Sequence, residues 1–146
     1  MIAFEDLQPG QTITLGPTGA SREAVMAFAH AYDPQPFHLS DEAASRTYFE
    51  RLSASGWHTG AMMLALLTNN PVWPLACRGC HEIRDLRWKA PVYPDDRLSA
   101  EVAVTDCKAA ENDDTGVVTL AMRLRNQDAG TVAEMTVVLA VARCIG

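Results

Sequence analysis

The chain has 146 residues, of which 48% are hydrophobic and 21% charged, and its formal net charge at pH 7 is -6. This length and balance fit a single globular domain over residues 1–146 with a sizeable core. The negative charge and the lack of clustered Lys or Arg argue against a nucleic-acid partner, because such a partner is held by neutralising its phosphates.

The start of the chain lacks the basic segment and apolar run of a secretory signal. We therefore expect a cytoplasmic protein that is not bound to a membrane, with its four cysteines as reduced thiols. Residues 12–15 alternate between polar and apolar side chains as a short strand does. The glycines and proline of segment 16–19 should end that strand.

A first helix is predicted from Ser21, a suitable N-cap, to Tyr32. It should end there because Asp33 precedes Pro34, and the residue before a proline avoids the helical conformation. Four residues recur at helical spacing and are expected to face the core: Val25, Phe28, Ala29 and Tyr32.

The segment 34–38 has two prolines in its first three positions, so it cannot form a regular helix or a central strand. Ser40 can then cap a short helix whose first turn carries Asp41 and Glu42, where carboxylates favour the positive end of the helix dipole. We expect an ordered loop followed by a short helix. The residues that offer packing surface there are Ala43, Ala44, Tyr48 and Phe49.

The segment from Ala54 to Thr68 is predicted to be the central helix of the core. Every residue from Ala61 to Leu67 is apolar, unlike the striped pattern of a surface helix, so we expect burial on all sides. At ~1.5 Å per residue this helix is too short to cross a bilayer. It contains no Asp or Glu, so an acid or base must come from elsewhere, while its start near Gly56 offers free backbone N–H groups.

Four segments later in the chain are predicted as strands: 82–88, 97–107, 116–125 and 131–143. Turns are expected at residues 112–114 and 126–130. Helices followed by an antiparallel meander indicate an α+β domain. A long antiparallel sheet wrapped around one buried helix resembles the hotdog fold. Its edge strands favour pairing with a second copy, as a homodimer or a dimer of dimers.

Asp33 and His38 are the strongest candidates for catalysis. They lie five residues apart, and the turns at Pro34 and Pro36 allow the chain to double back between them. A carboxylate and an imidazole facing one cavity can move protons to and from a water molecule near neutral pH. The alternative is structural: Asp33 would cap a turn and His38 would cap the following helix.

Several segments together resemble the MaoC-like acyl dehydratases, the group that includes R-specific enoyl-CoA hydratases. That family carries Asp, any residue, usually Asn, then Pro, any residue and His, and residues 33–38 follow this pattern. The resemblance covers most of the chain. The other similar segments are Asp41-Glu42-Ala43-Ala44, Ala54-Ser55-Gly56-Trp57-His58-Thr59, residues 4–10, Leu86-Arg87-Trp88, Pro91-Val92 and Pro94.

The resemblance implies a hotdog fold and reversible addition of water across the double bond of a trans-2-enoyl thioester, such as enoyl-CoA, without a cofactor. Asp33 and His38 would hold and deprotonate the water and return a proton to the α-carbon, in roles that the sequence does not assign. The N–H of Gly56 would bind the thioester oxygen as enolate charge develops. The alternative for Gly56 is close packing at the start of the helix.

The remaining substrate contacts that we expect on this interpretation are Gln35, Phe37, Ser55, Trp57, Arg87 and Lys89. Basic residues on a strand, here Arg84, Arg87 and Lys89, usually form a solvated face, but in an acidic protein they are the first candidates to meet a coenzyme A phosphate. Gln35 stands where the family usually has Asn, and Asp95 stands where it usually has Gly. Both departures affect substrate identity more than the acid-base pair.

The string Cys77-Arg78-Gly79-Cys80-His81 matches a haem attachment pattern, but that pattern belongs to exported proteins. A zinc site would need a fourth ligand from Cys107 or Cys144. We expect ordinary loop thiols and no metal. His58 is expected either to line the pocket entrance or to be structural.

Three other functions are weighed against the hydratase. One is a hotdog thioesterase, which usually has a carboxylate on or near the central helix. The second is a silent hotdog protein that binds an acyl thioester or a partner subunit. The third is a metal-binding module built on Cys77 and Cys80.

Overall fold

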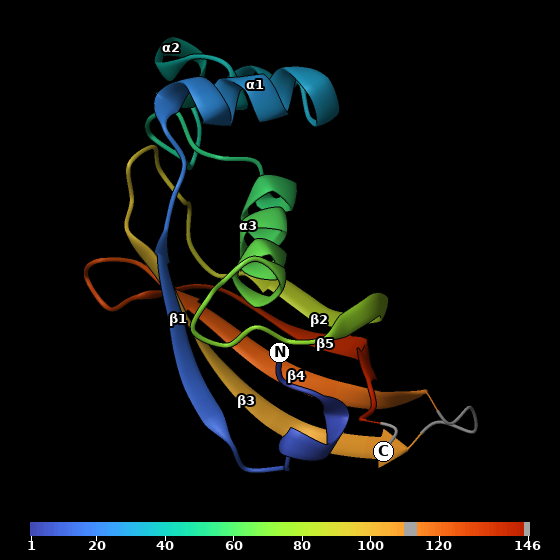
Figure 1. The fold of residues 1–146 in the computed structure, drawn as a ribbon. Coiled ribbons are helices and arrows are strands. Elements are labelled where there is room, and N and C mark those ends of the chain that lie inside the picture. Colours follow the sequence, from blue (N-terminus) through green and yellow to red (C-terminus); the bar gives the residue numbers. More distant parts are fainter. Residues whose placement is uncertain (110–113, 145–146) are drawn as a thin grey trace.

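The computed structural model describes residues 1–109 and 114–144. Its main feature is one antiparallel sheet that curves around the helix α3 (Figure 1). The strands are β1 (Thr12–Thr18), β2 (Cys77–Trp88), β3 (Leu98–Ala109), β4 (Thr115–Arg125) and β5 (Thr131–Ala142). The helices are α1 (Arg22–Tyr32), α2 (Asp41–Ala44) and α3 (Gly56–Thr68), with 3₁₀ turns η1 (Phe4–Asp6) and η2 (Pro36–His38).

The strand order across the sheet is β1-β3-β4-β5-β2. The strands β3, β4 and β5 form the predicted meander in the centre. The edge strands β1 and β2 both extend beyond their predicted bounds. β1 continues past Gly16 to Thr18 with a shift of register after Leu15, because an edge strand tolerates proline and a bulge. β2 begins at Cys77, so Cys77 and Cys80 lie in a strand and not in a loop. Most of the predicted turn at 112–114 lies outside the described residues.

The core lies between α3 and the facing side of the sheet. Along β4 the predicted alternation is confirmed, because Val118, Leu120, Met122 and Leu124 are all buried. On α3, Met63 and Leu67 face the sheet and are almost fully buried. Among the described helices, none is long and apolar enough to cross a membrane.

The prediction that α3 is buried on all sides is wrong for a single chain. Trp57 is 63% exposed, and Ala61 and Ala65, one and two turns further along the same face, are also exposed. The sheet covers only one side of the helix, which leaves an apolar strip facing outward.

The helices α1 and α2 lie beyond the N-terminal end of α3 (Figure 1). Their predicted caps are confirmed, since Ser21 accepts a hydrogen bond from the Ala24 N–H and Ser40 accepts one from the Ala43 N–H. The prediction that Tyr32 faces inward is wrong, because Tyr32 is 76% exposed at the end of α1. The loop after α1 contacts the start of α3, because the hydroxyl of Ser55, the N-cap of α3, donates to Asp33.

Candidate active site

The loop between α1 and α2 folds back on itself and brings Asp33 and His38 together. The Gln35 N–H donates to the Asp33 carbonyl at 2.8 Å, and the His38 N–H donates to the Gln35 carbonyl at 2.9 Å. Pro36 begins the turn η2, where its fixed φ and missing N–H are tolerated. As a result, Nε2 of His38 lies 3.5 Å from Oδ2 of Asp33.

His38 is only 4% exposed, and its imidazole is held on the side away from Asp33. Its Nδ1 lies 2.8 Å from the Ser53 carbonyl oxygen, which can only accept, so Nδ1 carries a proton. The segment that supplies Ser53 is fixed to the neighbouring loop, because the Ala54 N–H donates to the Val92 carbonyl at 2.8 Å. In the neutral ring, Nε2 therefore presents its lone pair toward Asp33.

The Asp33 carboxylate is held on both oxygens by neutral donors. Ser55 Oγ donates to Oδ2 at 2.7 Å, and Gln35 Nε2 donates to Oδ1 at 2.7 Å. The Ser55 hydroxyl is the largest cause that holds the pKa of Asp33 below its usual value, and Gln35 and the nearby His38 act in the same direction against the opposing effect of burial. Asp33 is therefore ionised near neutral pH.

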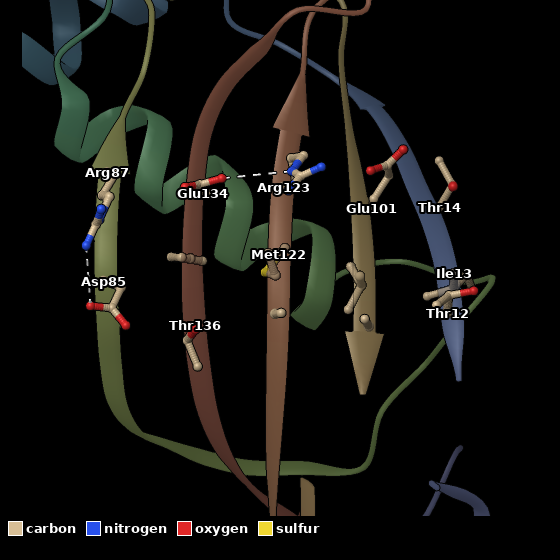
Figure 2. Close-up of a pocket in the computed structure, with 14 residues that line it drawn as sticks. Thr12, Ile13, Thr14, Asp85, Arg87, Glu101, Met122, Arg123, Glu134 and Thr136 are labelled. Carbon is tan, nitrogen blue, oxygen red and sulfur yellow. Dashed lines mark ion pairs between the residues drawn. The ribbon is translucent and has the colours of Figure 1, made fainter. Parts of the chain in front are cut away.

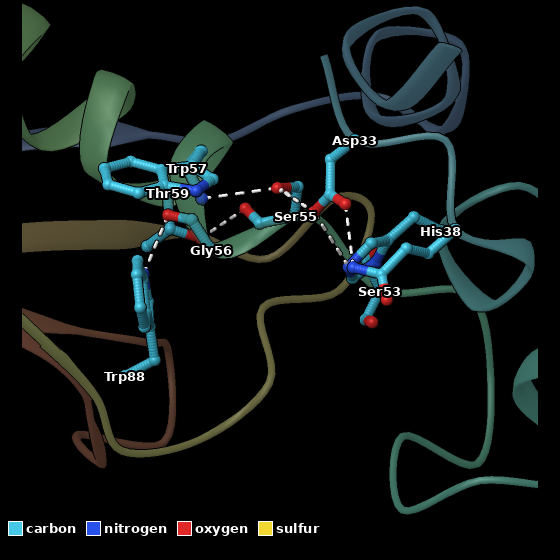
Figure 3. Close-up of polar contacts among 9 residues, drawn as sticks. Asp33, His38, Ser53, Ser55, Gly56, Trp57, Thr59 and Trp88 are labelled. Carbon is cyan, nitrogen blue, oxygen red and sulfur yellow. Dashed lines mark hydrogen bonds and ion pairs between the residues drawn. The ribbon is translucent and has the colours of Figure 1, made fainter.

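Ser55 links this carboxylate to the start of α3. It is the N-cap of that helix, and its Oγ accepts from the Trp57 N–H at 3.3 Å while donating to Asp33 (Figure 3). A hydroxyl has one proton to donate, and here Asp33 receives it. Ser55 is fully buried, so in this chain it contacts Asp33 directly and not the open part of the cavity.

Gly56 is the first residue of α3, where a backbone N–H has no partner within the helix. A Cβ at Gly56 would stand 2.5 Å from the Trp88 indole, and the indole N–H donates to the Gly56 carbonyl at 2.7 Å. Close packing alone thus requires glycine here (Figure 3). Trp88 was not predicted as a site residue, although its segment carries part of the resemblance.

A cavity of about 390 Å³ opens beside these groups. Its polar side includes Asp33, His38 and Gln35, and most of its remaining lining is apolar or aromatic. Two of the predicted contacts, Phe37 and Trp57, also line it. Phe37 stacks on Phe49 with ring centroids 5.0 Å apart, which gives the cavity a rigid aromatic wall.

The two predicted basic contacts line different hollows. Lys89 lines the cavity and pairs with Glu134 at 3.3 Å. Arg87 lies on the sheet face that points away from α3, in a larger hollow of about 770 Å³ (Figure 2). That hollow contains ion pairs such as Arg123 with Glu134 at 3.9 Å, but neither Asp33 nor His38. Arg84, the third basic candidate, pairs with Glu82.

His58 lies outside the cavity lining and stacks on Phe28, with ring centroids 4.6 Å apart. Burial lowers the pKa of His58, so the ring is neutral near pH 7. Within residues 1–109 and 114–144, no group of three or more His, Cys, Asp or Glu side chains could hold a metal ion, and this includes the surroundings of Cys77 and Cys80.

The chain is similar to known proteins over most of its length. The MaoC like domain matches residues 5–125. The MaoC-like dehydratase from Rhodospirillum rubrum is 34% identical, with a TM-score of 0.85 and 99% of each chain covered. The (R)-hydratase from A. caviae, involved in PHA biosynthesis, is 28% identical, with a TM-score of 0.71 over 92% of this chain and 97% of that chain.

A further relative is the uncharacterised protein YdeM of Bacillus subtilis, which is 29% identical over 124 residues, 85% of this chain and 87% of the relative. The structural likenesses confirm the predicted α+β hotdog fold. Since the domain match spans most of the sequence, the chain belongs to the MaoC-like domain family.

Proposed function

We propose that this protein adds water reversibly to a trans-2-enoyl thioester, most simply an enoyl-CoA, to give a 3-hydroxyacyl thioester. The observation that carries the proposal is the Asp33–His38 pair, which faces an apolar cavity beside the first turn of α3. The family and its R-hydratase relatives support hydratase or dehydratase chemistry in general. The enoyl thioester is our own extension of that chemistry to this chain.

The geometry of the pair suits a bound water molecule. In the neutral tautomer set by Ser53, Nε2 of His38 is an acceptor, as is Asp33 Oδ2, and the two atoms lie 3.5 Å apart. One water can donate a hydrogen to each, which leaves its oxygen lone pair free to attack C3 of the substrate. The pair takes a proton from the water and supplies one to C2, so it ends each turnover in its starting protonation state.

The start of α3 offers the complementary group for the thioester. As the new C–O bond forms at C3, the electrons of the double bond move onto the thioester oxygen as an enolate. The Gly56 N–H is proposed to bind that oxygen, with help from the positive end of the helix dipole. Removing one such donor typically costs ~3 kcal/mol in the transition state.

The acyl chain is proposed to occupy the aromatic part of the cavity near Phe37, with Trp57 at its mouth. Among the basic residues expected to meet coenzyme A, Lys89 lies at the cavity. Arg87 lines a different hollow, so we assign that contact to Lys89 first.

We also propose that two chains form a homodimer, which could pair further as a dimer of dimers. Two neighbouring features support this assembly. The exposed strip of α3 carries Trp57, Ala61 and Ala65, and no charged residue lies on that helix. Within the described part of the chain, the edge strand β2 pairs with β5 on one side and with no strand on the other, so that side offers backbone groups to a second copy.

The test is the loss of the enoyl-thioester absorbance on a panel of acyl-CoA chain lengths. The wild type should turn over, while Asp33→Asn and His38→Ala should each lose about 10²-fold or more of kcat, because general acid-base groups contribute ~10²–10⁴-fold. A wild type no faster than both variants would refute the proposal. Release of free thiol from a saturated acyl-CoA would favour a thioesterase, and tight binding without turnover would favour a silent hotdog protein.

A further inference from the structure

Gln35 occupies the position between the two residues of the acid-base pair and contacts both through its backbone. Its N–H donates to the Asp33 carbonyl, and its own carbonyl accepts from the His38 N–H. Prolines on either side restrict φ at the neighbouring positions. The backbone of Gln35 therefore has little freedom to move away from the pair.

The side chain of Gln35 adds a third contact. Its amide Nε2 donates to Oδ1 of Asp33 at 2.7 Å, while the other carboxylate oxygen, Oδ2, receives the Ser55 hydroxyl and faces His38. The two carboxylate oxygens thus have different surroundings, and only Oδ2 is directed toward the imidazole. A carboxylate held at one oxygen cannot rotate to exchange its two oxygens without breaking that hydrogen bond.

We propose that Gln35 is a positioning residue, not a substrate contact, which keeps Oδ2 of Asp33 facing His38 and sets the acidic limit of activity. The part concerning activity rests on the proposed hydratase function, while the part concerning the carboxylate does not. The longer side chain found here in place of the usual Asn is what reaches back to Oδ1 of its neighbour.

The charges around Asp33 support this assignment. His38, from η2, is the titratable group that lies next to the carboxylate, and Lys89 and Tyr48 line the same cavity. The Lys89 ammonium is engaged by Glu134 at 3.3 Å. The amide of Gln35 lowers the pKa of Asp33 because its N–H stabilises the ionised form. Losing that donor must raise the pKa, so activity that needs the carboxylate should fail at a higher pH.

Two substitutions with side chains of similar length to Gln35 test whether its hydrogen-bond donor, and not its size, affects Asp33. Gln35→Met removes the donor, and Gln35→Glu replaces it with a second acid. We expect carboxyl ¹³C NMR, without substrate, to show the Asp33 titration shifted upward by about one pH unit in Gln35→Met and further in Gln35→Glu. The acidic limb of kcat/KM should shift by the same amount, with KM at the optimum changed less than about twofold.

Gln127→Met is the matched control, because Gln127 Nε2 also donates to a carboxylate, Asp96 Oδ1 at 3.0 Å, outside the cavity. It should leave the Asp33 titration unchanged. Since Gln35 is exposed, both of its variants should keep the fold, which the same spectra report.

An unchanged Asp33 titration in both Gln35 variants would overturn the positioning role, as would a raised KM with an unmoved pH profile, which would indicate a substrate contact. If the wild type shows no turnover while the titration shifts as expected, the proposed function fails and the positioning of Asp33 stands.

Discussion

The hydroxyl of Ser55 has two partners that belong to different parts of the molecule. It caps α3 by accepting from the Trp57 N–H, and it donates its proton to Asp33. Helix stability and the ionisation of the carboxylate therefore depend on the same oxygen. This coupling separates Ser55 from an ordinary capping residue such as Ser21, whose hydroxyl accepts from the Ala24 N–H at the start of α1.

Replacement of Ser55 by alanine should have two measurable effects. Loss of the cap should cost about 1 kcal/mol of unfolding free energy in urea. The pKa of Asp33 should rise, because its largest stabilising donor is removed, and the acidic limb of kcat/KM should move to higher pH. Since the lowered pKa stabilises the native state only while Asp33 is ionised, the difference in stability should shrink as the pH falls through that pKa.

Ser21→Ala is the matched control, because it removes the cap of α1 and leaves Asp33 untouched. It should lower stability by a similar amount without moving the pH profile. If both serine variants had the pH profile of the wild type, the hydrogen bond from Ser55 to Asp33 would not affect activity.

Asp33, His38 and Gly56 could be picked out from the motif. The hydrogen-bond partners of the adjacent residues Gln35 and Ser55 could not be predicted. Ser55 and Gln35 were expected to contact substrate, whereas in this structure both donate to Asp33. Which rotamer a polar side chain adopts depends on what the folded loop places within hydrogen-bond distance, and the spacing of residues along the sequence does not contain that information.

At the scale of elements, the junction of α3 with β2 depends on one glycine. The Trp88 indole packs directly on Gly56 and donates to its carbonyl. The last residue of one element thereby fixes the first turn of another. The pairing is invisible in the sequence, because the two residues are 32 positions apart and β2 reaches this place only through the sheet.

Gly56→Ala should destabilise the protein by about 1–3 kcal/mol in urea unfolding, since the new Cβ would stand 2.5 Å from the indole and force it to move. The control is Gly60→Ala in the same helix, where the Cβ would meet only Leu86 at 3.9 Å, an ordinary contact. That variant should be as stable as the wild type, or more stable by about 0.5–1 kcal/mol. Equal stability of the two variants would contradict the packing role assigned to Gly56.

The central strands were easier to predict than the edges. In β4, buried and less buried side chains alternate because one face packs on α3. In β2 the register shifts, and the composition of Cys77-Arg78-Gly79-Cys80 is typical of a loop although the segment is part of the strand. An edge strand has one partner and is largely exposed, so its composition is less constrained. Neither the order of the sheet nor the separation of Arg87 from the cavity follows from local composition.

At the scale of the whole molecule, the sequence of α3 is more apolar than one chain requires. The side facing the sheet needs Met63 and Leu67, yet Ala61 and Ala65 on the opposite side are exposed. A helix that is apolar all round is normally buried all round. The expectation drawn from the sequence was therefore wrong for the isolated chain, and a second copy covering this strip would account for the pattern.

Ala65→Glu should weaken that assembly, because it places an unpaired carboxylate in an apolar contact. Light scattering after size exclusion should give twice the chain mass, or a multiple of it, for the wild type, and the variant should dissociate at concentrations at least ~10-fold higher. Ala27→Glu, at an exposed position of α1, is the control for a new surface charge on a helix and should assemble as the wild type does. A monomeric wild type, or an Ala65→Glu variant with unchanged mass at every concentration, would show that α3 does not meet a second copy through this strip.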